Sequence, residues 1–126
     1  MKIRVYYEDT DCGNVVYYAN YLKYMERSRT EFLRERGVDL AAYHGKGLLF
    51  TVAEAHITYK APARYNDLLD AASRVRETGS SSVVLATDIR RASDGLLLVE
   101  GEVRLVCVNA SGRPTRIPEE IRKTLG

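Results

Sequence analysis

The sequence contains no apolar stretch of the length that crosses a membrane and few of the side chains that bind metal ions. No segment comes near the ~18 uninterrupted apolar residues of a membrane span, and the N-terminus, MKIRVYYEDTD, lacks the apolar core of a signal peptide. We therefore expect no membrane span and a location in the cytoplasm. Only two cysteines and two histidines occur, and their spacing fits no zinc site, so we expect free thiols and no metal.

A long basic stripe is also missing. The 19 basic and 17 acidic residues are mixed along the chain and leave a net charge of +2. Because a protein that follows a nucleic-acid backbone needs a continuous basic surface, we expect no nucleic-acid partner. The mild positive balance still favours a small phosphorylated ligand.

The length of 126 residues leaves room for a single domain, spanning residues 1–126. A chain of this size buries about two thirds of the surface that its unfolded form exposes. No internal repeat, low-complexity segment or linker interrupts the sequence. We therefore look for one core and one site.

One long helix is predicted between Asn20 and Gly37, because apolar or small side chains recur there at steps of three and four. Asn20 or a residue before it can cap the start, and Gly37 suits a left-handed end. The side chains expected on the buried side are Tyr21, Leu22, Met25, Ser28, Arg29, Phe32 and Leu33.

Alternation with a period of two predicts strands in most of the remaining chain. The expected strands are residues 3–7, 48–60, 67–78, 81–92 and 96–108, and residues 118–125 can add a short final helix. Turn-forming residues separate the strands. The sequence thus predicts an α+β fold in which one long helix covers one face of an antiparallel sheet of about five strands.

The segment that points most clearly to chemistry runs from Tyr6 to Tyr24. It sets the carboxylate of Asp11 on a small-residue turn just before the helix, whose first backbone N–H groups can hold a developing negative charge. These are the two parts that acyl transfer to water requires. We expect Asp9 to hold the turn through hydrogen bonds, and Gly13 and Asn14 to supply its permissive backbone.

A cysteine nucleophile is a weaker alternative. Cys12 lies beside Asp11, but a reactive thiol needs a neighbouring base, and the only histidines are His44 and His56. His56 alternates with Val52 and Glu54, which suggests one strand face, and a lone histidine there is more often packed or exposed than catalytic.

Several motifs resemble a known family. They are YYEDTD at residues 6–11, VVYYANY at 15–21, YMERSR at 24–29, YKAPARYND at 59–67 and VCV at 106–108. Together they resemble the hotdog-fold acyl-CoA thioesterases of the 4-hydroxybenzoyl-CoA thioesterase group, and among these the bacterial Tol-Pal-associated enzymes. The resemblance implies a hotdog sheet wrapped around one helix. It also implies hydrolysis of an acyl-CoA thioester without a cofactor, since coenzyme A is part of the substrate.

The resemblance also assigns roles to residues. The catalytic aspartate falls on Asp11, which either activates a water as general base or attacks the thioester directly. The oxyanion donor falls on the backbone N–H of Tyr18, where many relatives have histidine. The residues placed in substrate binding are Val16, Tyr17, Asn20, Glu26 and Pro62.

Two further questions stay open at this stage. Glu26 is a rival catalytic acid, because another branch of hotdog thioesterases takes its carboxylate from the central helix; otherwise it pairs with Lys23 or Arg29. A non-catalytic hotdog module that binds acyl-CoA or a protein partner is the alternative function. In either case the exposed strand edge of a small sheet favours a homodimer or homotetramer.

Overall fold

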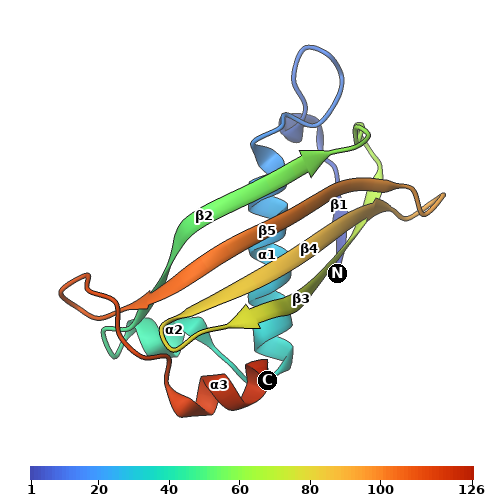
Figure 1. Ribbon diagram of the computed structural model, residues 1–126. Coiled ribbons are helices and arrows are strands. Elements are labelled where there is room, and N and C mark those ends of the chain that lie inside the picture. Colours follow the sequence, from blue (N-terminus) through green and yellow to red (C-terminus); the bar gives the residue numbers. More distant parts are fainter.

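The computed structural model describes residues 1–126 and shows one antiparallel sheet with a long helix across it (Figure 1). The elements in chain order are β1 (Lys2–Arg4), a 3₁₀ turn (Tyr7–Asp9), α1 (Asn20–Glu35), α2 (Leu40–His44), β2 (Leu49–Tyr59), β3 (Leu68–Thr78), β4 (Ser82–Arg91), β5 (Leu97–Val108) and α3 (Glu119–Leu125). The five strands lie in the order β1-β3-β4-β5-β2, so β2 is a free edge. The α+β hotdog architecture expected from the sequence is confirmed.

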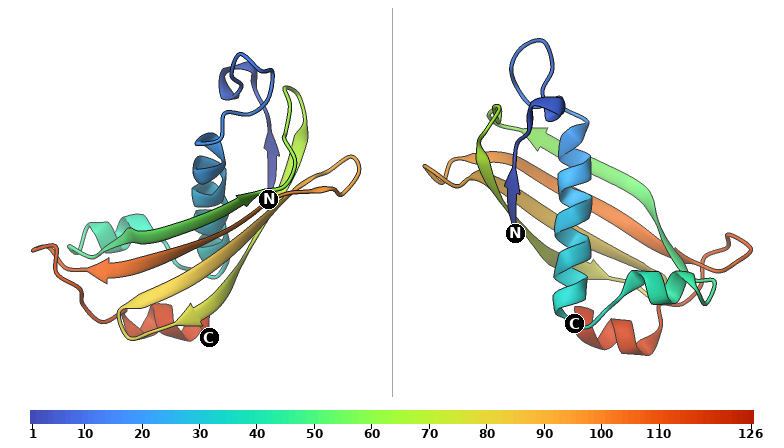
Figure 2. Two further views of the ribbon diagram at one scale, coloured as in Figure 1. Left: turned by 45° about the horizontal axis from the view of Figure 1, so that its top comes forward. Right: turned by 180° about the vertical axis from the view of Figure 1, so that it is seen from behind.

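Helix α1 packs on one face of the sheet, and the tilted view and the view from behind show it crossing the strands (Figure 2). Met25 and Tyr24 of the helix are almost completely buried against the strands. Gly101 of β5 lies directly beneath the Met25 side chain, where an added Cβ would collide with the sulfur. A side chain at this position would force Met25 to move, so the glycine lets the helix approach the sheet closely.

A short chain of hydroxyl groups also joins α1 to the sheet. Ser28 of α1 and Ser73 of β3 lie 2.7 Å apart, and Ser73 and Thr87 of β4 lie 2.8 Å apart. Ser28 and Thr87 are the two buried polar residues of the protein. Because each hydroxyl has a partner, the core keeps these polar groups without an unmet hydrogen bond.

The helix differs from its sequence prediction at two positions. Leu22 was placed on the buried side but is 42% exposed, whereas Tyr24 is 1% exposed and takes a place in the core. Asn20 does not cap α1, since the residue before the helix, Ala19, makes no side-chain cap and the Asn20 amide is used elsewhere. The left-handed end at Gly37 is confirmed by its φ of 83°.

The four long strands begin and end within about a residue of the expected limits, but two local features were missed. Residues Tyr7–Asp9 form a 3₁₀ turn, which shortens the first strand to Lys2–Arg4. A bulge in β2 places Val52 opposite Leu105 and the next paired residue, Glu54, opposite Arg104. The expected single face for Val52, Glu54 and His56 is therefore wrong, because the extra residue reverses the alternation.

Candidate active site

Asp9 organises the turn that precedes α1. Its carboxylate Oδ2 accepts a hydrogen bond from the backbone N–H of Tyr6 at 2.8 Å. Its carbonyl oxygen accepts from the Tyr17 N–H at 2.9 Å and from the side-chain amide of Asn20 at 2.8 Å. The predicted structural role of Asp9 is confirmed, and its contacts tie the turn to the start of the helix.

Asp11 stands at the tip of the same turn with its side chain exposed. Its Oδ1 accepts a hydrogen bond from the Gly13 N–H at 2.8 Å, and its own N–H donates to the Val15 carbonyl at 3.0 Å. Asn14 adopts a φ of 63°, as the permissive turn requires. Gly13 contributes space rather than a positive φ, since a Cβ there would lie 3.2 Å from Oδ1. The second oxygen, Oδ2, has no partner within the chain.

The backbone N–H of Tyr18 lies at the entrance to α1 and donates to no acceptor in the protein. The first hydrogen bonds of the helical turn come from later residues, with the Asn20 N–H donating to the Tyr17 carbonyl at 2.9 Å. The first N–H groups of a helix have no partner within it and carry the positive end of its dipole. The Tyr18 N–H is therefore free to bind a negatively charged oxygen.

A pocket of about 290 Å³ opens beside this amide. Its wall is formed by Val16, Tyr18, Tyr21, Tyr59, Lys60, Ala61 and Pro62. The Tyr59 hydroxyl donates to the Tyr18 carbonyl at 3.2 Å, and the two rings meet edge to face with centroids 6.3 Å apart. Since Tyr59 ends the edge strand β2, the pocket lies at the free edge of the sheet.

Of the residues placed in the site from sequence, the structure brings Val16, Tyr18 and Pro62 together around this pocket. Tyr17 lies next to it, with its ring 4.8 Å from that of Tyr18. The neighbouring Tyr18 side chain is the main cause that raises the pKa of the Tyr17 phenol. Asp11 does not line the pocket of the single chain.

Asn20 and Glu26 lie elsewhere. The Asn20 amide is held by the Asp9 carbonyl, as described above. Glu26 accepts a hydrogen bond from the Thr30 hydroxyl at 3.2 Å and lines a separate shallow depression on the exposed side of α1. The structure records no ion pair from Glu26 to Lys23 or Arg29. Their roles in substrate binding stay predictions.

Four pocket residues were not assigned from sequence: Tyr21, Tyr59, Lys60 and Ala61. The last three belong to the YKAPARYND segment, so the signal was present in the motif but gave no direction for each side chain. Tyr21 was expected in the core, where it is indeed buried. Its hydroxyl accepts a hydrogen bond from the Ala63 N–H at 3.0 Å, and burial is the main cause that raises its pKa.

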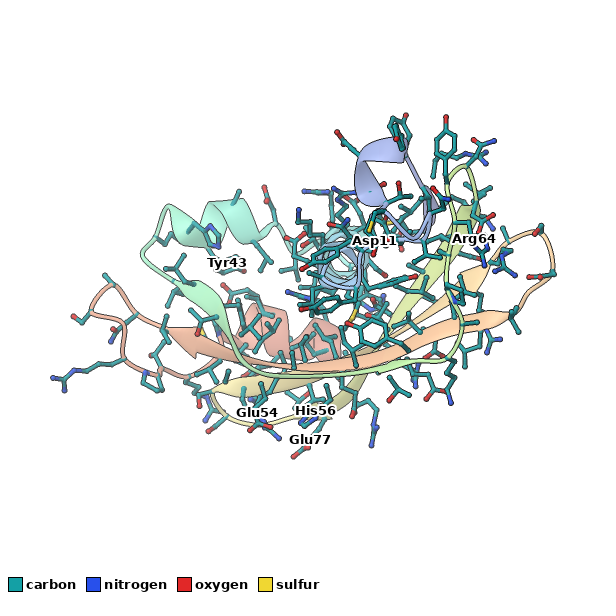
Figure 3. All side chains as sticks on the ribbon, turned by 90° about the horizontal axis from the view of Figure 1, so that it is seen from above. Asp11, Tyr43, Glu54, His56, Arg64 and Glu77 are labelled. Carbon is teal, nitrogen blue, oxygen red and sulfur yellow. The ribbon has the colours of Figure 1, made fainter.

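The other face of the sheet carries a different kind of hollow, of about 230 Å³, lined almost entirely by polar and charged residues. Glu54, His56 and Glu77 point away from α1 on this side, whereas Asp11 lies on the helix side (Figure 3). His56 approaches Glu54 at 3.8 Å and is exposed. Cys12 is free and exposed, with no hydrogen bond to a histidine, so no Cys-His pair is assembled.

Two general expectations concern metals and membranes. No three His, Cys, Asp or Glu side chains gather closely enough to hold a metal ion. None of the helices combines the length and the apolar character that crossing a bilayer demands.

A curved antiparallel sheet around one helix, with an unbonded amide and an aromatic pocket at the helix start, has the layout of a thioesterase-like protein. Comparison with known proteins agrees. Residues 5–125 match the family described as the thioesterase-like superfamily. The acyl-CoA thioester hydrolase YbgC of Escherichia coli O6:H1 is 38% identical over 120 residues, which cover 94% of this chain and 89% of that protein.

Solved structures agree with the family match. A hypothetical protein from Thermus thermophilus superposes with a TM-score of 0.93 at 33% identity, covering 99% of this chain and 95% of that one. A gentisyl-coenzyme A thioesterase superposes with a TM-score of 0.92 at 27% identity, covering 100% and 98%. The chain belongs to the thioesterase-like superfamily and has its hotdog fold.

Proposed function

We propose that the protein hydrolyses an acyl-CoA thioester to a free acid and coenzyme A at the start of α1. The family match and the 38% identity to an acyl-CoA thioester hydrolase support this activity. The observation that supports the location is that the Tyr18 N–H has no acceptor in the protein and that Tyr18 is one of the residues lining an aromatic pocket. The protein is a thioester hydrolase rather than a passive binding module.

The proposed reaction uses two groups that have no partner in the protein, one on Asp11 and one on Tyr18. The free Oδ2 of Asp11 accepts a proton from a water whose oxygen attacks the thioester carbonyl carbon. The carbonyl oxygen becomes negative and accepts a hydrogen bond from the Tyr18 N–H. The C–S bond then breaks, coenzyme A leaves as a thiolate that takes up a proton, and the acid is released.

Direct attack by Asp11 is the second route. Its carboxylate oxygen then bonds to the acyl carbon, coenzyme A leaves, and water cleaves the resulting mixed anhydride. Both routes place the negative oxygen at the same amide. They differ only in whether the acyl group is joined to the protein for part of the cycle.

In this proposal the acyl group of the substrate binds in the pocket. Three tyrosine rings, those of Tyr18, Tyr21 and Tyr59, give it an apolar wall with a polar rim, and Lys60 brings a positive charge to the same opening. Aromatic surfaces of this kind bind a short aliphatic or an aromatic acyl group. The Lys60 ammonium is placed where a phosphate-bearing substrate enters.

A second copy of the chain completes the proposed site. The edge strand β2 is 11 residues long, largely exposed and unpaired on one side, and the pocket lies at its end. Pairing with an identical chain would satisfy this edge and enclose the exposed Asp11. We expect a homodimer or homotetramer, and dilution to monomer should abolish hydrolysis. Full activity in a proven monomer would remove this part of the proposal.

The proposed compartment is the reducing cytoplasm, which fits the free thiols of Cys12 and Cys107. Cys107 is buried, and its burial raises the pKa of its thiol. Imaging of a tagged full chain in its native cell tests this placement. A tag found outside the cytoplasm would contradict it.

The activity is tested by release of free thiol from short-chain, long-chain and aromatic acyl-CoAs. Asp11→Asn keeps an oxygen that can accept from the Gly13 N–H but removes the base, so turnover should fall by about 10²–10⁴-fold. Glu8→Gln is the matched control, because it neutralises an exposed carboxylate in the same turn that makes no hydrogen bond or ion pair. Equal activity in wild type and Asp11→Asn would reject Asp11 as the catalytic group.

A further inference from the structure

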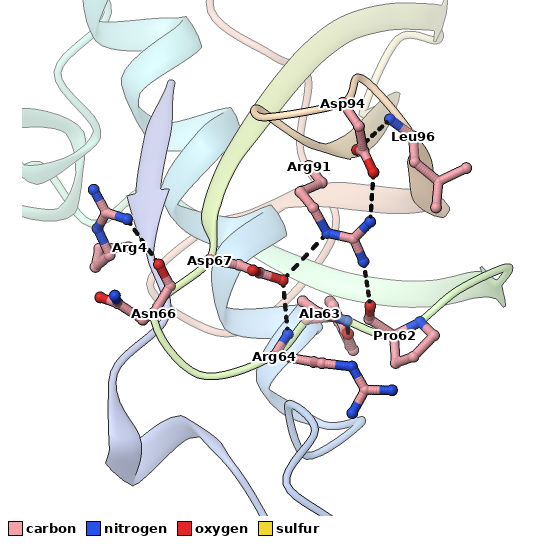
Figure 4. A network of polar contacts seen from close by, with 10 residues as sticks. Arg4, Pro62, Ala63, Arg64, Asn66, Asp67, Arg91, Asp94 and Leu96 are labelled. Atoms are coloured by element: carbon pink, nitrogen blue, oxygen red, sulfur yellow. Dashed lines mark hydrogen bonds and ion pairs between the residues drawn. The ribbon is translucent and has the colours of Figure 1, made fainter.

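The loop that carries Pro62 is held by one arginine from a distant strand. Arg91, the last residue of β4, extends its guanidinium into the loop between β2 and β3 (Figure 4). Its Nη2 donates to the Pro62 carbonyl at 3.0 Å and its Nε to the Asp67 carboxylate at 3.3 Å. Its Nη1 donates to the carboxylate of Asp94 at 2.8 Å. All three nitrogens of the guanidinium therefore have partners.

The contact with Asp67 extends into the loop. The same Oδ2 of Asp67 that faces Arg91 also accepts the Arg64 N–H at 2.9 Å, and the Asp67 N–H donates back to the Arg64 carbonyl at 3.1 Å. Arg91 thereby binds both the start of the loop, at Pro62, and its end, at Asp67. Hydrogen bonds between charged groups are stronger than neutral ones, so Arg91 adds a charged contact to the backbone hydrogen bonds that already hold the loop.

Between these two ends, Ala63 connects the loop to the proposed site. Ala63 is completely buried. Its N–H donates to the Tyr21 hydroxyl at 3.0 Å, and its carbonyl accepts the Val16 N–H at 2.8 Å. Val16 lines the pocket and is followed two residues later by Tyr18, the proposed oxyanion donor. The position of Ala63 thus sets the spacing between the Pro62 wall and the start of α1.

We propose that Arg91 is a positioning residue of the thioesterase site, which it reaches through the Pro62 carbonyl and Ala63 without touching the substrate. The inference rests on the proposed function for its role in catalysis, but its effect on the loop stands on the contacts alone. Arg91 is the one side chain from another element that binds the carbonyl of a pocket-lining residue in this loop. Its planar fork reaches acceptors in three directions, which a lysine ammonium on a flexible stem does not hold in fixed geometry.

The chain offers a neighbouring control. Arg90 precedes Arg91 on β4, is exposed, and donates to the Gly95 carbonyl at 3.2 Å within the turn after β4. Arg90→Gln removes the same charge from the same end of the strand without touching the Pro62 loop. Arg91→Lys keeps the charge and removes the fork. Together with Arg91→Gln, which removes both the charge and the fork, these two variants separate the effect of charge from that of geometry.

The first measurement does not depend on activity. Hydrogen–deuterium exchange should be about 10- to 100-fold faster at the amides of Val16 and Ala63 in Arg91→Gln than in wild type, because a charged hydrogen-bond network no longer holds the loop. Arg90→Gln should leave both amides unchanged, and Arg91→Lys should restore only part of the protection. Unchanged exchange at both amides in Arg91→Gln would overturn the proposal.

The second measurement uses the acyl-CoA that wild type turns over fastest. Arg91→Gln and Arg90→Gln are compared once circular dichroism shows that both are folded. Arg91→Gln should raise KM by roughly tenfold or more while kcat stays within about threefold. The reason is that the wall of the pocket moves, whereas Asp11 and the Tyr18 amide remain in place. A KM equal to that of Arg90→Gln would contradict the positioning role. If wild type hydrolyses no acyl-CoA while exchange still accelerates in Arg91→Gln, the proposed function fails and the structural effect of Arg91 stands.

If Arg91→Gln does not fold, Asp67→Asn is used in its place, because it weakens the contact between Arg91 and Asp67 from the other side. It keeps an oxygen for the Arg64 N–H and loses the charge that faces Arg91. Faster exchange at Val16 and Ala63, with a raised KM, is again the expected result. Wild-type exchange and KM in both Asp67→Asn and Arg91→Lys would overturn the proposal.

Discussion

Two irregular segments meet at the start of α1, and their aspartates differ in hydrogen-bond partners and in exposure. Asp67, in the loop after β2, accepts hydrogen bonds from the Arg64 N–H and from Arg91. Asp11, in the turn before α1, accepts one backbone N–H and leaves its second oxygen unbonded and exposed. A carboxylate that faces an arginine stabilises the fold and holds its proton less readily than an exposed carboxylate without a charged partner. We therefore assign Asp67 a structural role in the loop and Asp11 the catalytic role.

The backbone amides of the two segments show the same contrast. The Ala63 N–H is buried and bonded to the Tyr21 hydroxyl at 3.0 Å, whereas the Tyr18 N–H has no acceptor in the chain. A free donor is a cost in a folded protein unless solvent or a ligand satisfies it. The buried amide of the neighbouring loop is therefore bonded, whereas the proposed oxyanion donor stays available.

Removing the paired aspartate should have the largest effect on stability. Asp67→Ala deletes the acceptor of two hydrogen bonds, one of them charged, and should lower the free energy of unfolding by about 2–3 kcal/mol. Asp11→Ala should stay within about 0.5 kcal/mol of wild type, because only an exposed turn contact is lost. Urea denaturation of both variants measures the difference. Equal destabilisation would erase the contrast between the two carboxylates.

Removing the Tyr21 hydroxyl, which accepts the hydrogen bond of the buried Ala63 N–H, should have an intermediate effect on folding stability. Tyr21→Phe leaves the Ala63 N–H without a partner in the core, which should cost about 1–3 kcal/mol of unfolding free energy. Tyr59→Phe is the matched control, since its exposed hydroxyl donates to the Tyr18 carbonyl and its loss should cost less than about 1 kcal/mol. Thermal unfolding compares the pair. A smaller loss in Tyr21→Phe than in Tyr59→Phe would contradict the role given to Ala63.

Replacing Asp94, the third partner of Arg91, should have the smallest effect on folding stability, and this effect should appear only at acidic pH. The Leu96 N–H, and then Arg91, hold the pKa of the Asp94 carboxyl below its ordinary value. A lowered pKa in the folded state adds stability above the ordinary pKa, near 3.9, and this stability is lost as the pH falls through the folded value. Asp94→Asn should therefore reduce the loss of stability below about pH 4.

The pH dependence has its own control. Glu100→Gln removes an exposed carboxylate of β5 that makes no hydrogen bond or ion pair, so its acid unfolding curve should match that of wild type. Acid titration followed by circular dichroism compares the three proteins. An Asp94→Asn curve that coincides with wild type would show that Asp94 adds nothing to the Arg91 network.

The sequence was sufficient for the fold because the signals were local. Alternating β-branched and apolar side chains marked the long strands, and Gly37 marked the end of α1. The errors arose where one extra residue or one turn changed which side chains face the core. The bulge after Val52 reversed the face of Glu54 and His56, and Leu22 and Tyr24 exchanged exposed and buried positions.

The site was predictable only in part, for a related reason. Asp11, Tyr18 and Val16 lie in one short segment, so the motif located them together. Arg91 contacts Pro62 and Asp67 across 29 and 24 residues of sequence, and no periodicity connects them. Contacts between separate loops depend on the three-dimensional arrangement of the strands.

The most direct test of the central claim is the amide proton shift of Tyr18 in the presence of an acyl-CoA analogue that keeps the carbonyl but replaces the sulfur by a methylene group. A carbonyl oxygen seated at the proposed oxyanion site should move the Tyr18 amide resonance strongly downfield, while the Ala63 amide, already bonded to Tyr21, should stay near its free position. Saturating binding of the analogue with no change at Tyr18 would contradict the account.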